Sequence, residues 1–248
     1  MPAEKELNTI VASFDAPVQC VLSKQTLDVL QNMSMFCTHF VSDEKDHIRM
    51  FVPGAIIIYD LPEEERLPDF AIPSIAAFMN TCSVFEPDEL SFAFTDKFVQ
   101  ISDLKSYLRF LYVVNKEILH LPKSYDFPST MFKGYSKYQS TVNLTTDVIN
   151  KLKKVSSFMD LKMLEIEMVD GKGTLTLRNP DVGFDSIYSV EVEGTGTCSI
   201  NIQIVNMKFI TGDYTCSFDE SRIQFLNNEI PLRYIIAKSV TSTDRKDK

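Results

Sequence analysis

The sequence predicts an α+β protein in which one domain occurs twice in tandem, each copy having helices laid on one face of hairpin-rich sheets. Three observations predict this class. Segments of the two halves match at nearly constant spacing, several stretches alternate apolar and polar residues, and each half contains an amphipathic helical pattern at an equivalent place. The chain has 248 residues, 44% of them apolar, which is enough for two cores.

The first repeated element is a helix. Residues 22–36, "LSKQTLDVLQNMSMF", align without gaps on residues 144–158, "LTTDVINKLKKVSSF", at an offset of 122. Each copy opens with a hydroxyl residue suited to an N-cap, Ser23 or Thr145, and apolar residues follow at helical spacing. In the second copy we expect the buried face to consist of Ile149, Leu152, Val155, Ser156 and Met159.

Strands surround this helix in each half. Residues 91–101 align on 215–225 at an offset of 124, and residues 69–78 align on 201–210. Alternating stretches such as "LEIEM" and "TLTLR" predict strands with one buried face, and "DGKG" at 170–173 predicts a tight hairpin. Two further strands are expected around the Pro-Gly turn at 53–54. Pro73 is placed in the first turn of a short helix, and Lys208 falls on the equivalent helix of the second copy.

These matches predict the domain organisation. The N-terminal domain covers 1–119, a connector covers 120–138, the C-terminal domain covers 139–240, and 241–248 form a flexible tail. The connector contains five aromatic residues: Tyr125, Phe127, Phe132, Tyr135 and Tyr138. They either pin the connector to the domains or also rim an apolar pocket for a partner peptide, and the sequence leaves both interpretations open.

The sequence offers no recognisable catalytic chemistry. Apolar runs long enough to span a membrane, a signal-peptide pattern, phosphate-binding glycine loops and nucleophile elbows are absent. The five scattered cysteines are typical of reduced core residues in a cytoplasmic protein, and the three histidines have no acid or cysteine at a ligand spacing. The acidic stretch at 62–69 is typical of a solvated loop. We therefore expect no enzyme, no cofactor and no metal.

The charges are distributed unevenly. A net charge of −9 argues against nucleic-acid binding on composition alone. However, no acid follows Asp147 in the second helix, and the predicted exposed face of that helix carries three lysines. The matching face of the first helix has no lysine; it consists of Asp28, Val29, Gln31, Asn32 and Met35. Such lysines usually serve only solubility, but their concentration in one copy favours a function. The helix-borne set is Lys24, Lys151, Lys153, Lys154 and Lys208.

Two regions make the sequence similar to a known family. The C-terminal stretch "VNMKFITGDYTCSF" followed by "IPLRYIIAKS" resembles the end of a sliding-clamp subunit. In the first half, "LSKQTLDVL" and "AIIIYDLP" are similar to the clamp of T4-type bacteriophages, and the two-domain plan is similar to proliferating cell nuclear antigen. The likeness covers residues 16–239. The chain departs from the family in its nearly uncharged first-half helices and its aromatic connector.

The resemblance implies a DNA polymerase processivity factor. Three chains would form a homotrimeric ring of six domains, with sheets outside and helices inside, and the helix-borne lysines would face double-stranded DNA without reading its sequence. Edge strands at 106–114 and 185–193 would close the ring, with an apolar seam of Tyr107, Phe110, Tyr112, Ile187 and Tyr188. The implied partner-peptide pocket consists of Phe127, Met131, Phe132, Leu232 and Ile235.

The resemblance further implies three partners and a compartment. A DNA polymerase would be tethered, a clamp loader ATPase would open the ring, and a phage-encoded chain would act in the host cytoplasm. Two alternatives stay open. One is a structural or regulatory protein that keeps the duplicated fold without encircling DNA, which a stable monomer would indicate. The other is an enzyme, which a deep pocket with a strongly perturbed acid pair would indicate.

Overall fold

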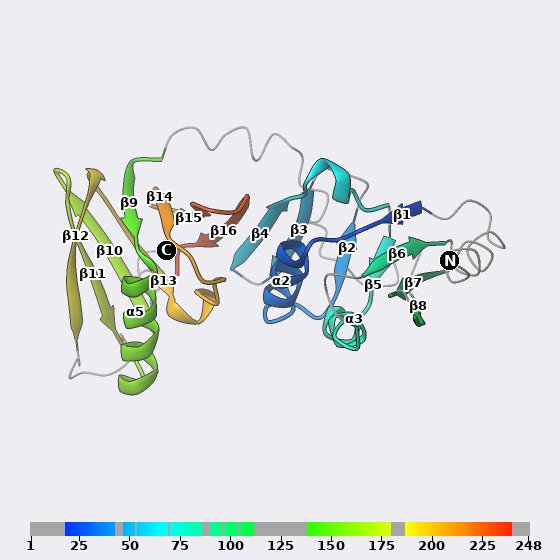
Figure 1. Ribbon diagram of the computed structural model, residues 1–248. Coiled ribbons are helices and arrows are strands. Elements are labelled where there is room, and N and C mark those ends of the chain that lie inside the picture. The colour runs from blue at the N-terminus through cyan, green and yellow to red at the C-terminus, as the bar shows by residue number, and fades with distance from the viewer. Residues whose placement is uncertain are drawn as a thin grey trace, which may run out of the picture. The chain divides into compact units, whose positions relative to one another are not determined.

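The structure is a computed structural model that describes residues 18–42, 47–52, 54–68, 70–85, 90–95, 97–103, 105–111, 138–179 and 187–239. The chain divides into two compact units (Figure 1). Unit 1 comprises Met1–Met50 and Ile58–Tyr125, and unit 2 comprises Phe51–Ile57 and Asp126–Lys248. Apart from Tyr138, the predicted connector lies outside the described residues, as does the predicted tail.

Unit 1 alternates short strands with two α-helices. In chain order the elements of the first half are β1 (Val18–Cys20), α2 (Lys24–Met33), β2 (Phe40–Ser42), β3 (His47–Val52), β4 (Ala55–Asp60), η1 (Glu63–Glu65), β5 (Phe70–Ile72), α3 (Ile75–Cys82), β6 (Ser91–Phe94), β7 (Phe98–Ser102) and β8 (Tyr107–Leu111). Strands β3 and β4 each have residues in both units. Four strands form an antiparallel sheet in the order β1-β6-β7-β8, while β2 pairs with β5 and β3 neighbours β4. Helix α2 packs against α3.

Unit 2 repeats this order with longer strands. Its elements are β9 (Ser140–Leu144), α5 (Thr146–Met159), β10 (Met163–Val169), β11 (Lys172–Arg178), β12 (Tyr188–Gly196), β13 (Cys198–Gln203), η5 (Ile204–Asn206), β14 (Tyr214–Phe218), β15 (Arg222–Asn227) and β16 (Leu232–Ala237). The strands are neighbours in the order β13-β10-β11-β12-β9-β14-β15-β16, and each pair in this series is antiparallel.

The two units share strand register as well as element order. Val18 of β1 lies opposite Phe94 of β6, and Ser140 of β9 lies opposite Phe218 of β14. The first members of the two pairs are 122 residues apart and the second members are 124 apart, which are the two offsets that align the sequence segments. The register of β6 with β7 likewise matches that of β14 with β15 at an offset of 124. Strand β8 pairs with β7 as β16 pairs with β15, but there the partner residue is shifted by two positions. The predicted internal repeat is therefore present in the hydrogen-bonded framework.

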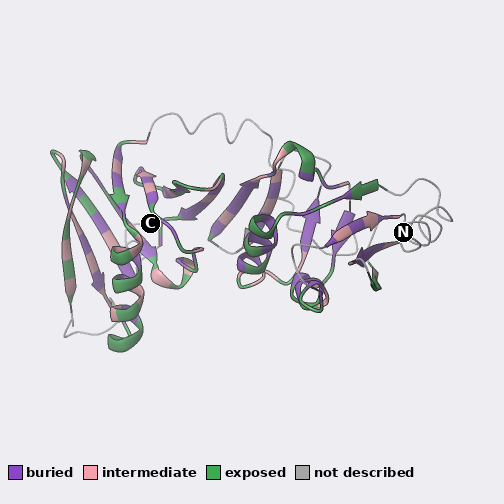
Figure 2. Ribbon diagram, in the orientation of Figure 1, coloured by how far each residue is buried: buried purple, intermediate pink, exposed green. Residues whose placement is uncertain are grey.

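Side-chain burial follows the alternation that the sequence predicts. In β11, β14 and β15, buried residues alternate with more exposed ones, so one face of each strand contributes to the core (Figure 2). Unit 2 has an aromatic centre in which Phe209 lies 4.6 Å from both Phe225 and Tyr234, measured between ring centroids. Strand β12 differs because none of its residues is fully buried.

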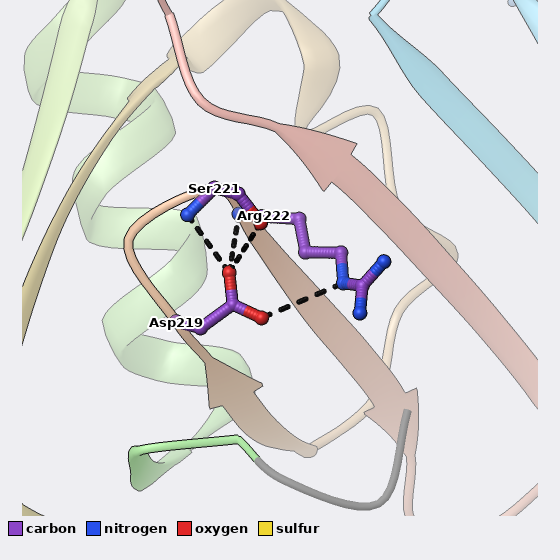
Figure 3. Close-up of polar contacts among 3 residues, drawn as sticks. All are labelled: Asp219, Ser221 and Arg222. Atoms are coloured by element: carbon purple, nitrogen blue, oxygen red, sulfur yellow. Dashed lines mark hydrogen bonds and ion pairs between the residues drawn. The ribbon is translucent and has the colours of Figure 1, made fainter. Parts of the chain in front are cut away.

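Two turns in unit 2 have clear local causes. Asp170 and Gly171 connect β10 to β11 with positive φ angles of 51° and 86°, as a two-residue hairpin loop requires, which confirms the predicted hairpin. Between β14 and β15, Asp219 Oδ1 accepts hydrogen bonds from the Ser221 N–H (2.8 Å), the Arg222 N–H (3.1 Å) and the Ser221 hydroxyl (Figure 3). Burial raises the pKa of Asp219, but these hydrogen bonds outweigh it and the net pKa is lowered.

Three local predictions are wrong. Helix α3 begins at Ile75 with Ser74 as its N-cap, so Pro73 lies outside the helix. The short helix predicted around Lys208 is absent, because η5 is a three-residue 3-10 turn that ends at Asn206. Met207 and Phe209 are buried on either side of the exposed Lys208, which is the period-two pattern of an extended segment. Met159, predicted in the buried face of α5, is 39% exposed in its last turn.

Candidate nucleic-acid interface

Helix α5 is the element that carries most of the predicted interface. Its N-cap is Thr145, whose side chain accepts a hydrogen bond from the Val148 N–H (3.4 Å), as the sequence predicts. Asp213 supplies a second acceptor from a distant loop: its Oδ1 accepts bonds from the Thr146 N–H (2.6 Å) and hydroxyl (2.9 Å). These bonds lower the pKa of Asp213, so the carboxylate stays ionised at the positive end of the helix dipole.

The three lysines of α5 occupy two different environments. Lys151 and Lys154 are exposed, and the Lys151 ammonium lies 5.8 Å from the centroid of the Tyr188 ring. Lys153 is half-buried instead. Its Nζ donates to the Phe209 carbonyl at 3.4 Å, and burial lowers its pKa. Lys151 and Lys154 therefore present positive charge to solvent, while part of Lys153 belongs to the packing of unit 2.

Lys208 lies beside this helix without being on one. It follows η5 and precedes Phe209, whose carbonyl accepts the Lys153 bond, so the fold brings Lys153 and the Lys208 segment together. Phe209 is fixed by its aromatic neighbours, and the Tyr214 hydroxyl donates to the Ile210 carbonyl at 2.7 Å. The position of Lys208 is consequently set by buried aromatic packing rather than by helix geometry.

In unit 1 the equivalent helix presents little charge. Lys24 is exposed as the first residue of α2, which places a cation at the less favourable end of the helix dipole. The positions that match Lys151 and Lys154 are Val29 and Asn32, and both are buried. Their predicted exposure is therefore wrong: α2 buries six of its ten residues, whereas α5 buries three of fourteen.

Acidic residues gather on the other side of the unit 2 sheet. Glu165, Glu167, Glu191 and Glu193 share the polar face of β10 and β12, opposite the face that contributes to the core. Two cations of β11, Lys172 and Arg178, share that face, and Arg178 Nη2 lies 3.3 Å from Glu165 Oε2. Among the described residues of these strands and of α5, carboxylates thus prevail on the outer sheet face and lysines on the exposed face of the helix.

Several described strands end a sheet, β1 and β13 among them, and the two strands that concern the predicted seam are β8 and β12. Strand β8 is terminal in its sheet, and its pairing with β7 occupies one side. In β12, the residues from Tyr188 to Glu193 pair with β11 on one side, while β9 pairs only with Gly194–Gly196. Within the described ranges no strand covers the other side of that first part of β12. These are the two strands that the sequence predicts at the subunit seam.

The predicted seam residues differ in exposure. Tyr107 is 46% and Ile187 57% exposed, whereas Phe110 is partly covered because its ring makes an edge contact with Phe78 at 5.5 Å. Tyr188 is half-exposed beneath Lys151, and Tyr112 lies outside the described residues. The prediction missed Leu108 and Leu111 of β8, although apolar residues on both faces of "YLRFL" already indicated a strand that needs a second covering layer.

The two predicted peptide-pocket residues that lie in the described part of the chain are both buried. Leu232 is fully buried and Ile235 nearly so, although they lie on opposite faces of β16. Phe127, Met131 and Phe132 lie outside the described residues.

The described residues of unit 1 include a cavity lined partly by a cysteine and, separately, a Cys–His pair. A cavity of about 580 Å³ in unit 1 is lined by residues that include Cys20, Ser23, Glu65 and Ser91, and burial followed by the Glu65 charge raises the pKa of Cys20 to about 12. Cys37 Sγ and His39 Nδ1 lie 3.7 Å apart, a pair that the sequence analysis overlooked.

Burial raises the pKa of Cys37 and lowers that of His39, so both are neutral and no thiolate forms at neutral pH. The five cysteines are free thiols, four of them buried. Among the described residues, no group of three or more His, Cys, Asp or Glu side chains is placed to hold a metal ion. No described helix is long and apolar enough to cross a membrane.

The two repeated units together define the fold of the sliding clamps. The DNA polymerase III β subunit of Borrelia burgdorferi is similar to this chain with a TM-score of 0.68 and 12% identity, covering 92% of this chain and 64% of that one. The Helicobacter pylori β clamp, solved bound to a DNA ligase peptide, has a TM-score of 0.66 and 11% identity, covering 92% and 67%. The PCNA2–PCNA3 complex of Sulfolobus tokodaii has a TM-score of 0.63 and 12% identity, covering 89% of this chain and 98% of that one.

These comparisons establish the fold. The chain spans about two thirds of the length of the two bacterial proteins and nearly the whole length of the archaeal one. No protein-family model matches the sequence, and no curated protein matches it.

Proposed function

We propose that this protein is a sliding clamp, a ring of three identical chains that encircles double-stranded DNA and tethers a replicative DNA polymerase to its template. The observation that carries the proposal is the exposed lysine face of α5 within a clamp-fold unit whose opposite sheet face is acidic. A protein that passes DNA through its centre needs this separation of charge, because the outer surface must not compete for the duplex.

The lysines suit a contact that holds DNA loosely. Lys151 and Lys154 extend from one helix face toward solvent, and an ammonium group contacts phosphate as a point charge without reading bases. A few such contacts give weak, salt-dependent and sequence-independent affinity. Retention then comes from the closed ring, and weak contacts allow the ring to move along the duplex.

Ring closure would use the uncovered edges of β8 and β12. Strand β8 of one chain would pair with the first part of β12 of the next, which covers both edges and the exposed apolar residues of β8. Such a head-to-tail contact closes into a ring when the rotation per chain is right. Three chains of two units each would give a ring of six units.

The remaining partners follow from this role. A clamp loader ATPase would open the ring around DNA, and the polymerase would bind through a short apolar peptide. The candidate peptide site includes the aromatic connector, with Phe127, Met131 and Phe132. The proposal includes no catalytic step, so the protein acts by holding other proteins on DNA.

The test combines native mass with DNA binding. A triple variant of Lys151→Ala, Lys154→Ala and Lys208→Ala should keep a trimeric mass while its duplex affinity falls. The slope of log affinity against log salt concentration is negative, and it should become less steep by about 0.9 for each phosphate that an ammonium group no longer neutralises. A charge-matched control carries Ala at the exposed Lys97, Lys105 and Lys172 and should retain the wild-type slope.

Two outcomes would overturn the proposal. The first is a stable monomer across the concentration range, or a particle without a central opening in electron micrographs, which would favour a duplicated clamp-fold protein with a structural or regulatory role. The second is an equal decrease in affinity for the triple variant and its control, which would remove α5 from the DNA contact.

A further inference from the structure

Phe158 is the most exposed large apolar side chain among the described residues. It is 91% exposed in the last turn of α5, so it contributes almost nothing to the core of unit 2. A single exposed apolar side chain is common on protein surfaces and does not by itself indicate a partner, so the side chains beside Phe158 decide what it can do.

The position of Phe158 on the helix indicates what that partner is. Lys151, Lys154 and Phe158 are spaced by three and four residues, so they form one stripe along α5, which we call the lysine–phenyl stripe. The carboxylates of this helix and its cap lie at its two ends: Asp147 in the first turn and Asp160 at the C-cap, where Asp160 is 3.8 Å from Lys162. Between these ends the stripe is positive, and its apolar member is aromatic.

Positive side chains that track a phosphate backbone, next to an aromatic ring on which a base can stack, are the features by which proteins bind single-stranded nucleic acid. We propose that the lysine–phenyl stripe binds single-stranded DNA, with Lys151 and Lys154 on phosphates and Phe158 stacked on an unpaired base. Lys154 and Phe158 are about 6 Å apart along the helix axis, a reach suited to a phosphate and a base of neighbouring nucleotides.

An unpaired base is a better partner for this ring than a base pair. In a duplex the base faces are covered by their neighbours, so a phenyl ring must open a base step before it can stack. A single-stranded overhang offers the same face without that cost. The inference rests on the proposed function, since α5 must face DNA, and it makes the protein prefer a duplex that continues into a single strand over a blunt duplex.

The absence of tryptophan from the sequence permits a direct optical test. The variant Phe158→Trp carries a single tryptophan at the stripe. Its fluorescence should be quenched on titration with a duplex that has a thymidine overhang, because stacking on a base quenches indole emission. The same duplex with blunt ends should leave the emission nearly unchanged. Equal quenching by both DNAs, or by neither, would overturn the inference.

Affinity measurements supply the matched comparison. Fluorescence anisotropy with labelled DNA should show that Phe158→Ala weakens affinity for the overhang DNA at least about fivefold and leaves affinity for the blunt duplex unchanged. Phe158→Leu keeps an apolar side chain without a π face and should behave like the alanine variant, whereas Phe158→Trp should retain the wild-type preference. Val169→Ala removes another exposed apolar side chain, at the β10–β11 hairpin, and should have no effect on either DNA.

The outcomes separate this inference from the function on which it rests. One outcome is that the double variant Lys151→Ala, Lys154→Ala weakens binding to both DNAs while Phe158→Ala changes the affinity for both equally or not at all. In that case the clamp function stands and the stacking role of Phe158 is wrong. If Phe158→Ala instead changes the native mass, Phe158 belongs to a contact between copies, and the inference is also wrong. If the lysine variants bind both DNAs normally and the chain is a monomer, the proposed function itself fails.

Discussion

Helices α2 and α5 begin in the same way and are used differently. Each has a hydroxyl N-cap, and each receives a carboxylate from a distant segment: Glu65 Oε2 accepts from the Ser23 N–H at 3.1 Å, and Asp213 Oδ1 accepts from the Thr146 N–H at 2.6 Å. Beyond the first turn they diverge, since α2 is mostly buried and α5 mostly exposed. The repeat thus preserves the way in which a helix is started while leaving its surface free to change.

The difference in exposure has a structural cause in each unit. In unit 1, α2 packs against the eight-residue helix α3. In unit 2, the corresponding place in the chain is taken by the three-residue turn η5, which offers no helical surface for α5 to pack against. Without a second helix, most of α5 is left uncovered, and Lys151 and Lys154 occupy positions that are buried in α2. The exposed lysines of unit 2 therefore lie where helix–helix packing is absent.

The largest expected effect comes from exchanging residues between the two helices. Val29→Lys places an unpaired charge in the core of unit 1 and should lower the free energy of unfolding by about 3–5 kcal/mol, because Val29 has no exposed surface. The reverse exchange in unit 2, Lys151→Val, should stay within about 0.5 kcal/mol. Chemical denaturation monitored by circular dichroism measures both. Similar destabilisation of the two variants would contradict the comparison.

The two distant carboxylates provide a second, smaller test. Glu65→Ala removes a buried carboxylate and leaves the Ser23 N–H without its charged acceptor, which should cost about 1–3 kcal/mol of unfolding free energy in unit 1. The adjacent and exposed Glu64→Ala is the matched control and should stay within about 0.5 kcal/mol. An equal response to the two substitutions would show that Glu65 does not fix the start of α2.

The cap of α5 should reveal itself through pH. The pKa of Asp213 is lowered in the folded protein by its bonds to Thr146, so its charge stabilises the fold above the pKa of the unfolded state, about 4. That stabilisation disappears as the pH falls through the folded-state value. Asp213→Asn should therefore melt below the wild type at pH 7, and the gap should close as the pH falls below about 4. A gap that stays constant with pH would assign the effect to geometry instead of charge.

The smallest effect is expected at Lys153. Lys153→Met keeps the aliphatic stem against Phe209 and removes an ammonium whose burial is already unfavourable, so stability should change by less than about 0.5 kcal/mol. Gln31→Met is the equivalent change in α2 and should be similarly mild. Destabilisation well above this level for Lys153→Met alone would mean that the bond from Nζ to the Phe209 carbonyl supports the aromatic centre.

Local features of the fold were predictable from the sequence. Ser23 and Thr145 are N-caps, the turn at Asp170 and Gly171 is a hairpin, and the two alignment offsets recur in the strand register. Each of these depends on residues that are close in sequence or on a pattern of period two or 3.6. Such signals do not depend on how distant segments pack.

The misplaced start of α3 is a local error, because Ser74 rather than Pro73 begins that helix, whereas the other main errors depend on distant packing. Val29 and Asn32 resemble exposed positions on a helical wheel, yet both are buried. Lys208 aligns with a helical residue, yet it follows a 3-10 turn. The pairing of Cys37 with His39 and the half-burial of Lys153 were not apparent either, because both require knowledge of the side chains that surround them.

By itself, the sequence determined the doubled α+β plan, the starts of α2 and α5 and the concentration of lysines in the second half, because periodicity, capping and composition act over a few residues. Only the tertiary structure decided which helix face meets solvent, which lysines are exposed and which strand edges are uncovered. The physical reason is that exposure is a property of what lies against a residue. In this protein, the helix that packs beside α2 has only a short turn as its counterpart beside α5.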